Sequence, residues 1–359
     1  MNKLFMSKNK YQHGGNIHET KGILYDFSAN LNPLGMPENV KAALKRRVKV
    51  WEHYPDPQCI RLINQLSLWE GVPGRWIACG NGSADLIFRL ALADQPQRAL
   101  VLAPTFTEYE KALCSVGCEI VHHELHRENQ FQVTEKLLDE IDESMDMVVL
   151  CNPNNPTGQL IAPELIGKVV DRCCRFGIRL LLDECSLDFV KKNEEYSGKR
   201  YLSHCANLVI LKTFSKIFAM PGIRLGYVMS SDNELLHLIS EIGQAWSVSS
   251  PAQTAGMAAM AKENLEYVDQ TQTIIEEERL YLEQGLQKLG IDVVPSQANF
   301  ILFHTQWELK EPLKRRSILI RSGDAYVGLS KDYYRVAIRS HQENEILLAA
   351  LADIMANGK

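Results

Sequence analysis

Short apolar runs alternate with longer amphipathic stretches through the middle of the chain. The runs lack a polar residue at every second position, which is typical of strands buried on both faces. The stretch over 160–176 has helical spacing, and its Pro163 stands where the first turn of a helix tolerates proline. This alternation predicts a βαβ series over about residues 50–250, and therefore a mostly parallel sheet covered by helices. The predicted strands are 99–103, 119–123, 147–151, 178–183, 208–212 and 224–229.

The pattern changes near residue 264. The stretch 264–289, rich in Glu, Gln and Leu, predicts one extended helix that bridges two parts of the molecule. Beyond it the pattern predicts a smaller α+β domain, with strands at 291–295, 299–304, 318–321 and 335–338 and helices near 309–316 and 342–356. We therefore expect three parts: an N-terminal segment that packs with the small domain (1–48), a large domain (49–265), and the linking helix with the small C-terminal domain (266–359).

Composition and net charge exclude some classes of binding partner. Of the 359 residues, 45% are hydrophobic and 23% are charged, as in folded globular proteins. The formal net charge of -5 leaves no basic surplus to neutralise a nucleic-acid backbone. No apolar run approaches the roughly 18 residues of a membrane span, and residues 1–10 lack the apolar core of a secretory signal. We expect no nucleic acid or membrane partner and a cytoplasmic location.

The cysteines do not predict a metal site. There are nine, an odd number scattered mostly through apolar stretches, which indicates buried thiols in a reducing compartment. Cys114 and Cys118, and the adjacent Cys173 and Cys174, have no Cys-x2-Cys spacing or histidine pair beside them. We therefore predict no bound metal.

Polar residues at the ends of the predicted strands are candidates for a site, because ligands of open α/β sheets bind at the carboxyl ends of the strands. Residues 80–85 read Gly-Asn-Gly-Ser-Ala-Asp before a helical stretch, so their N–H groups suit an anion. The motif is neither a P-loop nor a complete dinucleotide fingerprint, and a plain helix cap explains it equally well. In residues 152–158, Asn-Pro-Asn-Asn-Pro-Thr-Gly, a turn explains Pro and Gly but does not require Asn155.

Two further strand ends carry ionisable side chains. Asp183 ends a wholly apolar run; it is either a solvated strand-end residue or a buried carboxylate that needs a cationic partner. Lys216 lies in a loop bounded by apolar residues, where desolvation and nearby cations favour the neutral amine that a nucleophilic lysine requires. Ser215 and Arg224 are donors that can complete a phosphate site begun by residues 82–84.

The order of these motifs resembles that of fold type I enzymes that use pyridoxal 5′-phosphate. The resemblance extends from Asn-Leu-Asn-Pro-Leu-Gly at 30–35 to Arg339, nearly the whole chain. It implies an α/β large domain with a mostly parallel seven-stranded sheet covered by helices, and a smaller α+β domain. It also implies pyridoxal 5′-phosphate as the cofactor.

The resemblance assigns the catalytic groups residue by residue. Lys216 would bond covalently to the cofactor aldehyde and later carry a proton to or from the substrate. Asp183 would pair with the pyridine nitrogen and keep it protonated, which preserves the ring as an electron sink. Asn155 would donate to the ring hydroxyl, and Phe106 would stack on the ring, although a core aromatic is the alternative at that position. The family usually has an aromatic residue where this chain has Ser186, so we expect no cofactor contact there.

The same resemblance implies a phosphate cradle and a dimer. The cofactor phosphate would be held by Gly82, Ser83, Ala84, Ser215 and Arg224. Tyr54, in His-Tyr-Pro-Asp-Pro, matches a tyrosine that reaches this phosphate from a neighbouring subunit. We therefore expect a homodimer with shared active sites.

Two branches of the family compete for the reaction. Histidinol-phosphate aminotransferases share the Asn-Pro-Thr-Gly, Ser-Lys and Tyr-Pro motifs. L-threonine-O-3-phosphate decarboxylases, which serve cobalamin biosynthesis, share these and add the His-Gly-Gly-Asn found here at 13–16 and the Asp-Phe-Ser-Ala-Asn-Leu-Asn-Pro-Leu-Gly at 26–35. This favours the decarboxylase, which releases CO2 and (R)-1-amino-2-propanol O-2-phosphate. The substrate-binding residues that the resemblance implies are His13, Gly14, Asn32, Arg321 and Arg335.

Three alternatives remain open from the sequence. The first is the aminotransferase. The second is decarboxylation of L-serine O-phosphate, because one methyl group changes binding by only about 1 to 3 kcal/mol. The third is a catalytically idle cofactor-binding protein, which the presence of Lys216, Asp183 and Asn155 together disfavours.

Overall fold

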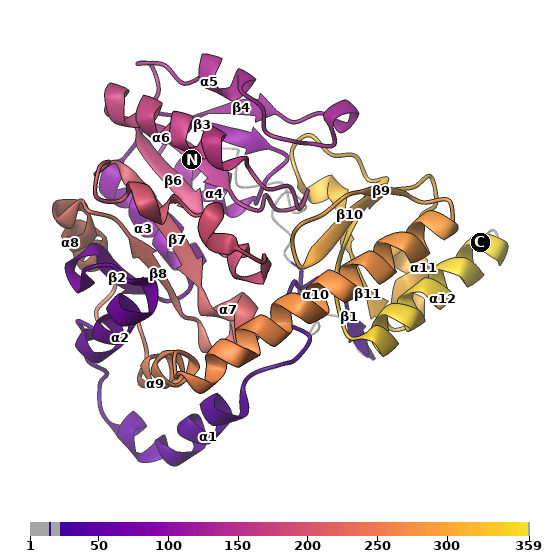
Figure 1. Ribbon diagram of the computed structural model, residues 1–359, viewed down its shortest axis with the longest axis horizontal. Helices are drawn as coiled ribbons and strands as arrows, with labels where there is room; N and C mark the ends of the chain where they lie inside the picture. The colour runs from indigo at the N-terminus through magenta and orange to yellow at the C-terminus, as the bar shows by residue number, and fades with distance from the viewer. Residues whose placement is uncertain (1–13, 16–21, 358–359) are drawn as a thin grey trace.

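The computed structural model describes residues 14–15 and 22–357. Its centre is a seven-stranded sheet in the order β2-β8-β7-β6-β5-β3-β4 (Figure 1). β8 runs antiparallel to both of its neighbours, and the other four pairings are parallel. The predicted mostly parallel seven-stranded sheet is therefore confirmed. The strands are β2 (Ile77–Gly80), β3 (Arg98–Ala103), β4 (Glu119–Glu124), β5 (Met147–Cys151), β6 (Arg179–Asp183), β7 (Leu208–Thr213) and β8 (Gly226–Met229).

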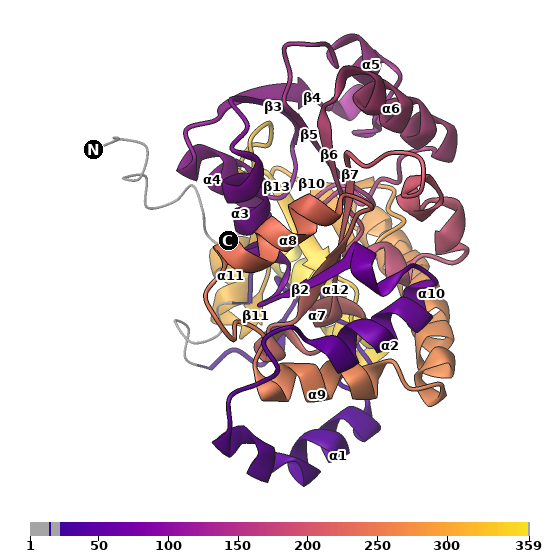
Figure 2. The ribbon, with the colours of Figure 1, turned by 90° about the vertical axis from the view of Figure 1, so that its left-hand side faces the viewer.

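Helices cover both faces of this sheet (Figure 2). Because successive strand residues point to opposite faces, each strand supplies two cores. On β5, Val149 packs with α3 (Ser83–Asp94), α4 (Glu108–Ser115) and α8 (Asn233–Ile242). Val148, one position earlier, belongs to the core that includes α2 (Ile60–Glu70) and α6 (Pro163–Phe176). The short helix α5 (Lys136–Asp139) lies near α6.

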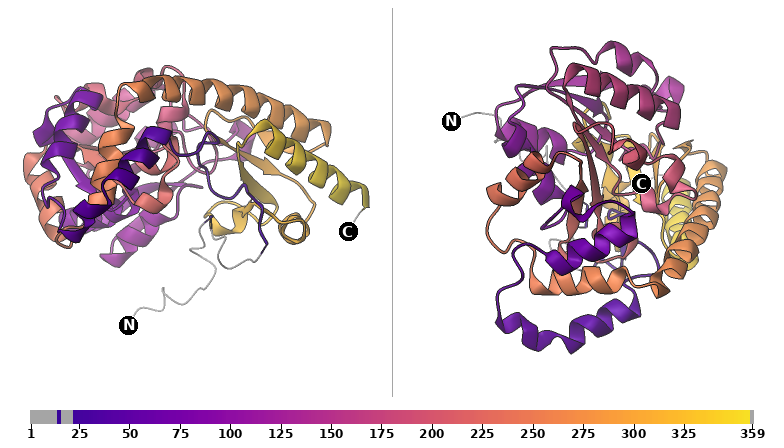
Figure 3. Two further views of the ribbon diagram at one scale, coloured as in Figure 1. Left: turned by 90° about the horizontal axis from the view of Figure 1, so that it is seen from below. Right: turned by 60° about the vertical axis from the view of Figure 1, so that its left-hand side comes forward.

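The helix α10 (Glu263–Lys288) links the large sheet to the C-terminal part (Figure 3). Its 26 residues span about 39 Å at 1.5 Å per residue. The C-terminal sheet has the order β12-β13-β10-β9 and packs with α10 and α12. Its elements are β9 (Asp292–Val294), β10 (Phe300–His304), α11 (Lys310–Arg315), β12 (Arg321–Ser322), β13 (Tyr333–Ala337) and α12 (His341–Asn357).

The N-terminal segment contacts both parts of the molecule. β1 (Tyr25–Asp26) pairs in parallel with β11 (Ile318–Leu319) near the C-terminal sheet. Farther along, α1 (Glu38–Arg46) packs against α9 (Ser250–Ala259), which also contacts α2 of the large-sheet core. No helix within the described ranges is long and apolar enough to cross a membrane. All nine cysteines are free thiols.

Three strand predictions differ from the structure. β2 was not predicted, because its four residues include one glycine and give too short an apolar run. β8 begins at Gly226, because Arg224 adopts a left-handed backbone with φ +59° that ends extended structure. The predicted strand 318–321 divides in two: β11 pairs with β1, whereas β12 pairs with β13.

Candidate active site

Strand register brings the predicted motifs to one edge of the large sheet. Gly80 of β2 lies opposite Gly226 of β8, which in turn lies opposite Thr213 of β7. The segments that follow β2 and β7 therefore begin on either side of Gly226. On the other side of β7, Leu211 is paired with Asp183, and Asp183 with Cys151. The carboxyl ends of four strands thus meet where ligands of such sheets bind.

Asp183 is a buried carboxylate that accepts hydrogen bonds from two donors. Its side chain accepts a 2.5 Å hydrogen bond from the Tyr109 hydroxyl and a 2.8 Å bond from the Cys185 N–H, and the residue is 4% exposed. Burial raises the pKa of Asp183, while the hydrogen bonds and the charge of Lys216 act in the opposite direction. No ion pair to Asp183 forms within the described part of the chain. The carboxylate therefore suits a protonated ring nitrogen.

Tyr109 was missed by the sequence reasoning as a partner of Asp183. It lies in the first turn of α4, six residues beyond the end of β3, and is fully buried. Its ring also contacts Phe106 edge-on, with centroids 5.5 Å apart. The tyrosine thus contacts both the predicted stacking residue and the predicted acid, and its position three residues after Phe106 was the only sequence signal for such a role.

Lys216 lies on the four-residue helix α7 (Phe214–Ile217) directly after β7. The Thr213 hydroxyl starts this helix by accepting a 3.2 Å bond from the Ser215 N–H. Burial, with a further contribution from the charge of Arg335, lowers the pKa of the Lys216 amine to about 8. At pH 7 roughly a tenth of the amine is then neutral, far more than for a lysine in water. The amine is suited to nucleophilic chemistry.

Asn32 supports this helix from the N-terminal segment. Its N–H donates to the carbonyl of Lys216 at 3.2 Å, and its side-chain nitrogen lies 2.7 Å from the carbonyl oxygen of Ile217. The same nitrogen lies 2.7 Å from the Thr271 hydroxyl of α10, and Asn32 is 2% exposed. Because these partners occupy the side-chain amide, the geometry favours a positioning role for Asn32 over the substrate contact that the resemblance implied.

The residues predicted to hold the cofactor phosphate include three that lie where α3 begins, Gly82, Ser83 and Ala84. Gly82 precedes the helix with φ +88°, and a Cβ there would lie 2.4 Å from Nη2 of Arg224. Arg224 is anchored by a 3.1 Å bond from Nη1 to the Pro221 carbonyl. The first-turn N–H groups of Ser83 and Ala84 have no partner inside their helix, because the N-terminal turn lacks preceding carbonyls. A guanidinium and a helix start thus meet at a glycine, which suits a bound phosphate.

Two buried arginines lie on neighbouring strands of the C-terminal sheet. Arg321 and Arg335 face each other in register on β12 and β13, and are 7% and 6% exposed. Nη1 of Arg335 donates to Oδ1 of Asn155 at 2.5 Å, so this arginine reaches the end of β5. The Nε atoms of both arginines have no hydrogen-bond partner among the described residues. Buried cations with unused donors suit an anionic ligand.

The glycine-rich N-terminal motif is only partly described. His13 lies outside the described residues. Gly14 packs on Ser28 so closely that a Cβ would lie 2.1 Å from the Ser28 carbonyl oxygen. That oxygen also accepts a 2.7 Å bond from Nη2 of Arg335. The motif therefore approaches the arginine pair through Ser28, a residue that the sequence reasoning did not select.

Tyr54 lies apart from these groups. It is 77% exposed and stacks on Trp246 with ring centroids 4.3 Å apart. Both rings line a surface hollow formed by residues 51–55, 244–246 and 249–251. Trp51 is also 42% exposed, so several large apolar side chains are gathered on this surface.

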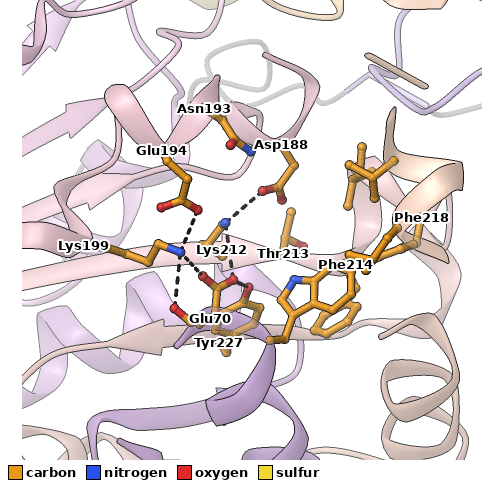
Figure 4. Close-up of a pocket in the computed structure, with 14 residues that line it drawn as sticks. Glu70, Asp188, Asn193, Glu194, Lys199, Lys212, Thr213, Phe214, Phe218 and Tyr227 are labelled. Carbon is orange, nitrogen blue, oxygen red and sulfur yellow. Dashed lines mark hydrogen bonds and ion pairs between the residues drawn. The ribbon is translucent and has the colours of Figure 1, made fainter. Parts of the chain in front are cut away.

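A second polar cluster lines a cavity next to α7, and the sequence reasoning did not predict it (Figure 4). Nζ of Lys212, on β7, lies 2.8 Å from Oδ1 of Asp188 and 3.4 Å from Oε1 of Glu70. Lys199 contacts the other oxygen of Glu70 at 3.0 Å. Although burial acts to raise it, the two lysines lower the pKa of Glu70 to about 2. The cluster lines a cavity of about 200 Å³ and ties β7 to α2 and to the segment after β6.

Comparisons with known proteins agree with this geometry. The family model for aminotransferase class I and II matches residues 23–351. A threonine-phosphate decarboxylase of Salmonella typhimurium is 37% identical over 96% of both chains. An adenosylcobalamin biosynthesis bifunctional protein of Leptospira interrogans is 29% identical over 96% of this chain and 41% of its own. A histidinol-phosphate aminotransferase structure from Clostridium acetobutylicum superposes with a TM-score of 0.87 at 26% identity, over 93% of this chain and 100% of its own. The chain therefore belongs to the aminotransferase class I and II family.

Proposed function

We propose that this protein decarboxylates L-threonine O-3-phosphate with pyridoxal 5′-phosphate, giving (R)-1-amino-2-propanol O-2-phosphate and CO2. The observation that carries the proposal is the pair Arg321 and Arg335, buried, in register, and each with an unused Nε donor. The phosphate of the substrate carries up to two negative charges, and the two guanidinium forks supply two positive charges in a geometry that suits phosphate as well as carboxylate oxygens. The 37% identity to a threonine-phosphate decarboxylase supports the same substrate.

The residues at the sheet edge fit the cofactor. Asp183 offers a buried carboxylate for the ring nitrogen, and Asn155 and Phe106 lie on the segments beside it. Gly82, Ser83, Ala84, Ser215 and Arg224 would hold the cofactor phosphate. When bound, the cofactor supplies a protonated ring that accepts the electron pair left when a bond at the substrate Cα breaks.

Lys216 moves protons in this scheme. With a pKa of about 8 the amine exchanges its proton near neutral pH. After CO2 leaves, its ammonium form donates a proton to the substrate Cα, which completes the replacement of the carboxylate by hydrogen. The bonds from Asn32 to the backbone of Lys216 and Ile217 hold the amine in place for this transfer.

The choice of reaction depends on orientation. The bond that breaks is the one held perpendicular to the cofactor ring. A tenfold preference between two bonds takes only about 1.4 kcal/mol. His13, Arg321 and Arg335 would hold the substrate phosphate so that the α-carboxylate lies out of the ring plane, which favours loss of CO2 over loss of the α-proton.

The exposed aromatic surface supports a homodimer with shared active sites. Tyr54 and Trp246 stack on each other while both remain substantially exposed, at 77% and 44%. Tyr54 would then reach the cofactor phosphate of the partner subunit. The mass of the holoenzyme by analytical ultracentrifugation tests this, and a monomer at micromolar concentration contradicts it. We also propose a cytoplasmic location and a role in cobalamin biosynthesis.

A product assay tests the reaction. Holoenzyme incubated with L-threonine O-3-phosphate should release CO2 without any oxo-acid acceptor, and mass spectrometry should detect aminopropanol phosphate. Serine phosphate and histidinol phosphate with 2-oxoglutarate are run in parallel. Faster decarboxylation of serine phosphate would change the assigned substrate. Consumption of histidinol phosphate and 2-oxoglutarate, without CO2 release from threonine phosphate, would make the protein an aminotransferase.

A further inference from the structure

Tyr326 contacts both arginines of the small domain. It follows a short turn of helix, η9 (Gly323–Ala325), and is 5% exposed. Its hydroxyl accepts a 3.0 Å hydrogen bond from Nη1 of Arg335. Its ring faces the guanidinium of Arg321, whose central carbon lies 5.5 Å from the ring centroid. One buried phenol therefore fixes the relative placement of two cations that lie opposite each other on neighbouring strands.

The hydroxyl proton of Tyr326 has no acceptor among the described residues. The phenol oxygen acts as an acceptor for Arg335, and in the described part of the chain no acceptor receives the O–H. A buried donor left unpaired costs about 1 to 3 kcal/mol. Acceptance of a bond from a guanidinium also polarises the O–H and makes it a better donor. The site therefore holds a buried donor that an incoming anion can satisfy.

We propose that Tyr326 donates its phenolic hydrogen to the phosphate of the substrate and so selects a phosphomonoester over a second carboxylate. A phosphate dianion has three terminal oxygens and carries up to two negative charges. Arg321 and Arg335 supply two positive charges, and Tyr326 supplies a neutral donor between them. A carboxylate has two oxygens and one charge, and leaves this donor unpaired. The inference rests on the proposed function, because it places the substrate phosphate at these arginines.

Replacement of Tyr326 by Phe removes the donor and keeps the ring beneath Arg321. The holoenzyme is titrated with two amines that each carry one of the two anionic groups, O-phosphoethanolamine and L-alanine, with cofactor absorbance as the signal. We expect Y326F to bind O-phosphoethanolamine about tenfold more weakly, the effect of one hydrogen bond to a charged group, and to bind L-alanine as the wild type does. With threonine phosphate, KM should rise by a similar factor while kcat stays within about threefold.

Tyr333 provides the matched control. It lies on β13, two residues from Arg335, and its ring packs on His304 and Phe131. Y333F removes a phenol hydroxyl from the same sheet and should leave both affinities unchanged. The melting temperature of each variant verifies that it is folded, and Y326L, which also removes the ring, should weaken both ligands.

The outcomes distinguish a failure of the proposed role of Tyr326 from a failure of the proposed decarboxylase function. An equal loss of affinity for both amines in Y326F means that Tyr326 only supports the arginines, and overturns the proposal. Unchanged affinity for O-phosphoethanolamine overturns it as well. If the wild type releases no CO2 from threonine phosphate, the proposed function fails; the titration with O-phosphoethanolamine still decides the role of Tyr326, because it measures binding without turnover.

Discussion

Lys212 is expected to contribute more to stability than any surface lysine, because its amine joins the buried Glu70 carboxylate to the partly buried Asp188 carboxylate. It is 6% exposed, and Lys212→Met removes the charge while it keeps an unbranched apolar side chain. Asp188 then loses its 2.8 Å partner, and Glu70 keeps Lys199 and the hydrogen bond from the Tyr227 hydroxyl. Removal of one member of a buried ion pair costs about 3 to 5 kcal/mol.

The lowered pKa of Glu70 gives a second estimate, of similar magnitude, for the stabilisation that its buried ion pairs provide. The folded state lowers the pKa of Glu70 from 4.5 to about 2, which corresponds to about 3 kcal/mol of stabilisation, shared between the two lysines and the hydrogen bond from Tyr227. Because the folded pKa is depressed, this contribution is fully present above pH 4.5 and disappears as the pH falls towards 2. We therefore expect the melting temperature of the wild type to fall across that acid range, and Lys212→Met to show a smaller fall.

The assay is a thermal melt of both holoenzymes at one scan rate and pH 7. Unfolding entropies of about 2.1 cal/mol/K per residue give about 0.75 kcal/mol/K for 359 residues. A loss of 3 to 5 kcal/mol then lowers the melting temperature by about 4 to 7 °C. The control is Lys191→Met, which breaks an exposed 2.5 Å ion pair with Glu276 worth about 0 to 1 kcal/mol. Equal melting temperatures for the two variants would refute the reasoning.

Three further predictions concern the cofactor site. Gly82→Ala should weaken cofactor retention at least tenfold in a dialysis assay, because the new Cβ meets Arg224 at a position with φ +88°. The control is Gly71→Ala, where φ is +70° and the space is open, and it should retain the cofactor as the wild type does. The rate at which the apoenzyme takes up pyridoxal 5′-phosphate should rise with pH and level off above about 8, because the neutral Lys216 amine is the nucleophile; a flat profile from pH 6 to 9 would contradict the lowered pKa. Asn32→Ala should lower kcat more than it raises KM for threonine phosphate, because the residue positions Lys216; a change confined to KM would instead indicate substrate contact.

Local pattern was sufficient for most elements of this protein. The apolar runs that became β5, β6 and β7 identified a buried parallel sheet, because burial on both faces removes polar positions from a strand. The linking helix, predicted over 264–289, is α10 at Glu263–Lys288. Residues 80–85, Asp183 and Lys216 each follow a predicted strand. The sequence therefore also predicted that they meet at one edge of the sheet, because the carboxyl ends of parallel strands lie at the same edge.

Tertiary structure alone decided which side chains meet. Tyr109 lies 74 positions from Asp183, and Arg335 lies 180 positions from Asn155, so no local periodicity signals either contact. The side-chain amide of Asn32 bonds to α7 and α10, which no sequence pattern signalled, because the path of the N-terminal segment buries the amide there. A sequence pattern reports whether a position is buried; the partner of a buried polar group depends on strand register and domain packing, which bring distant segments together.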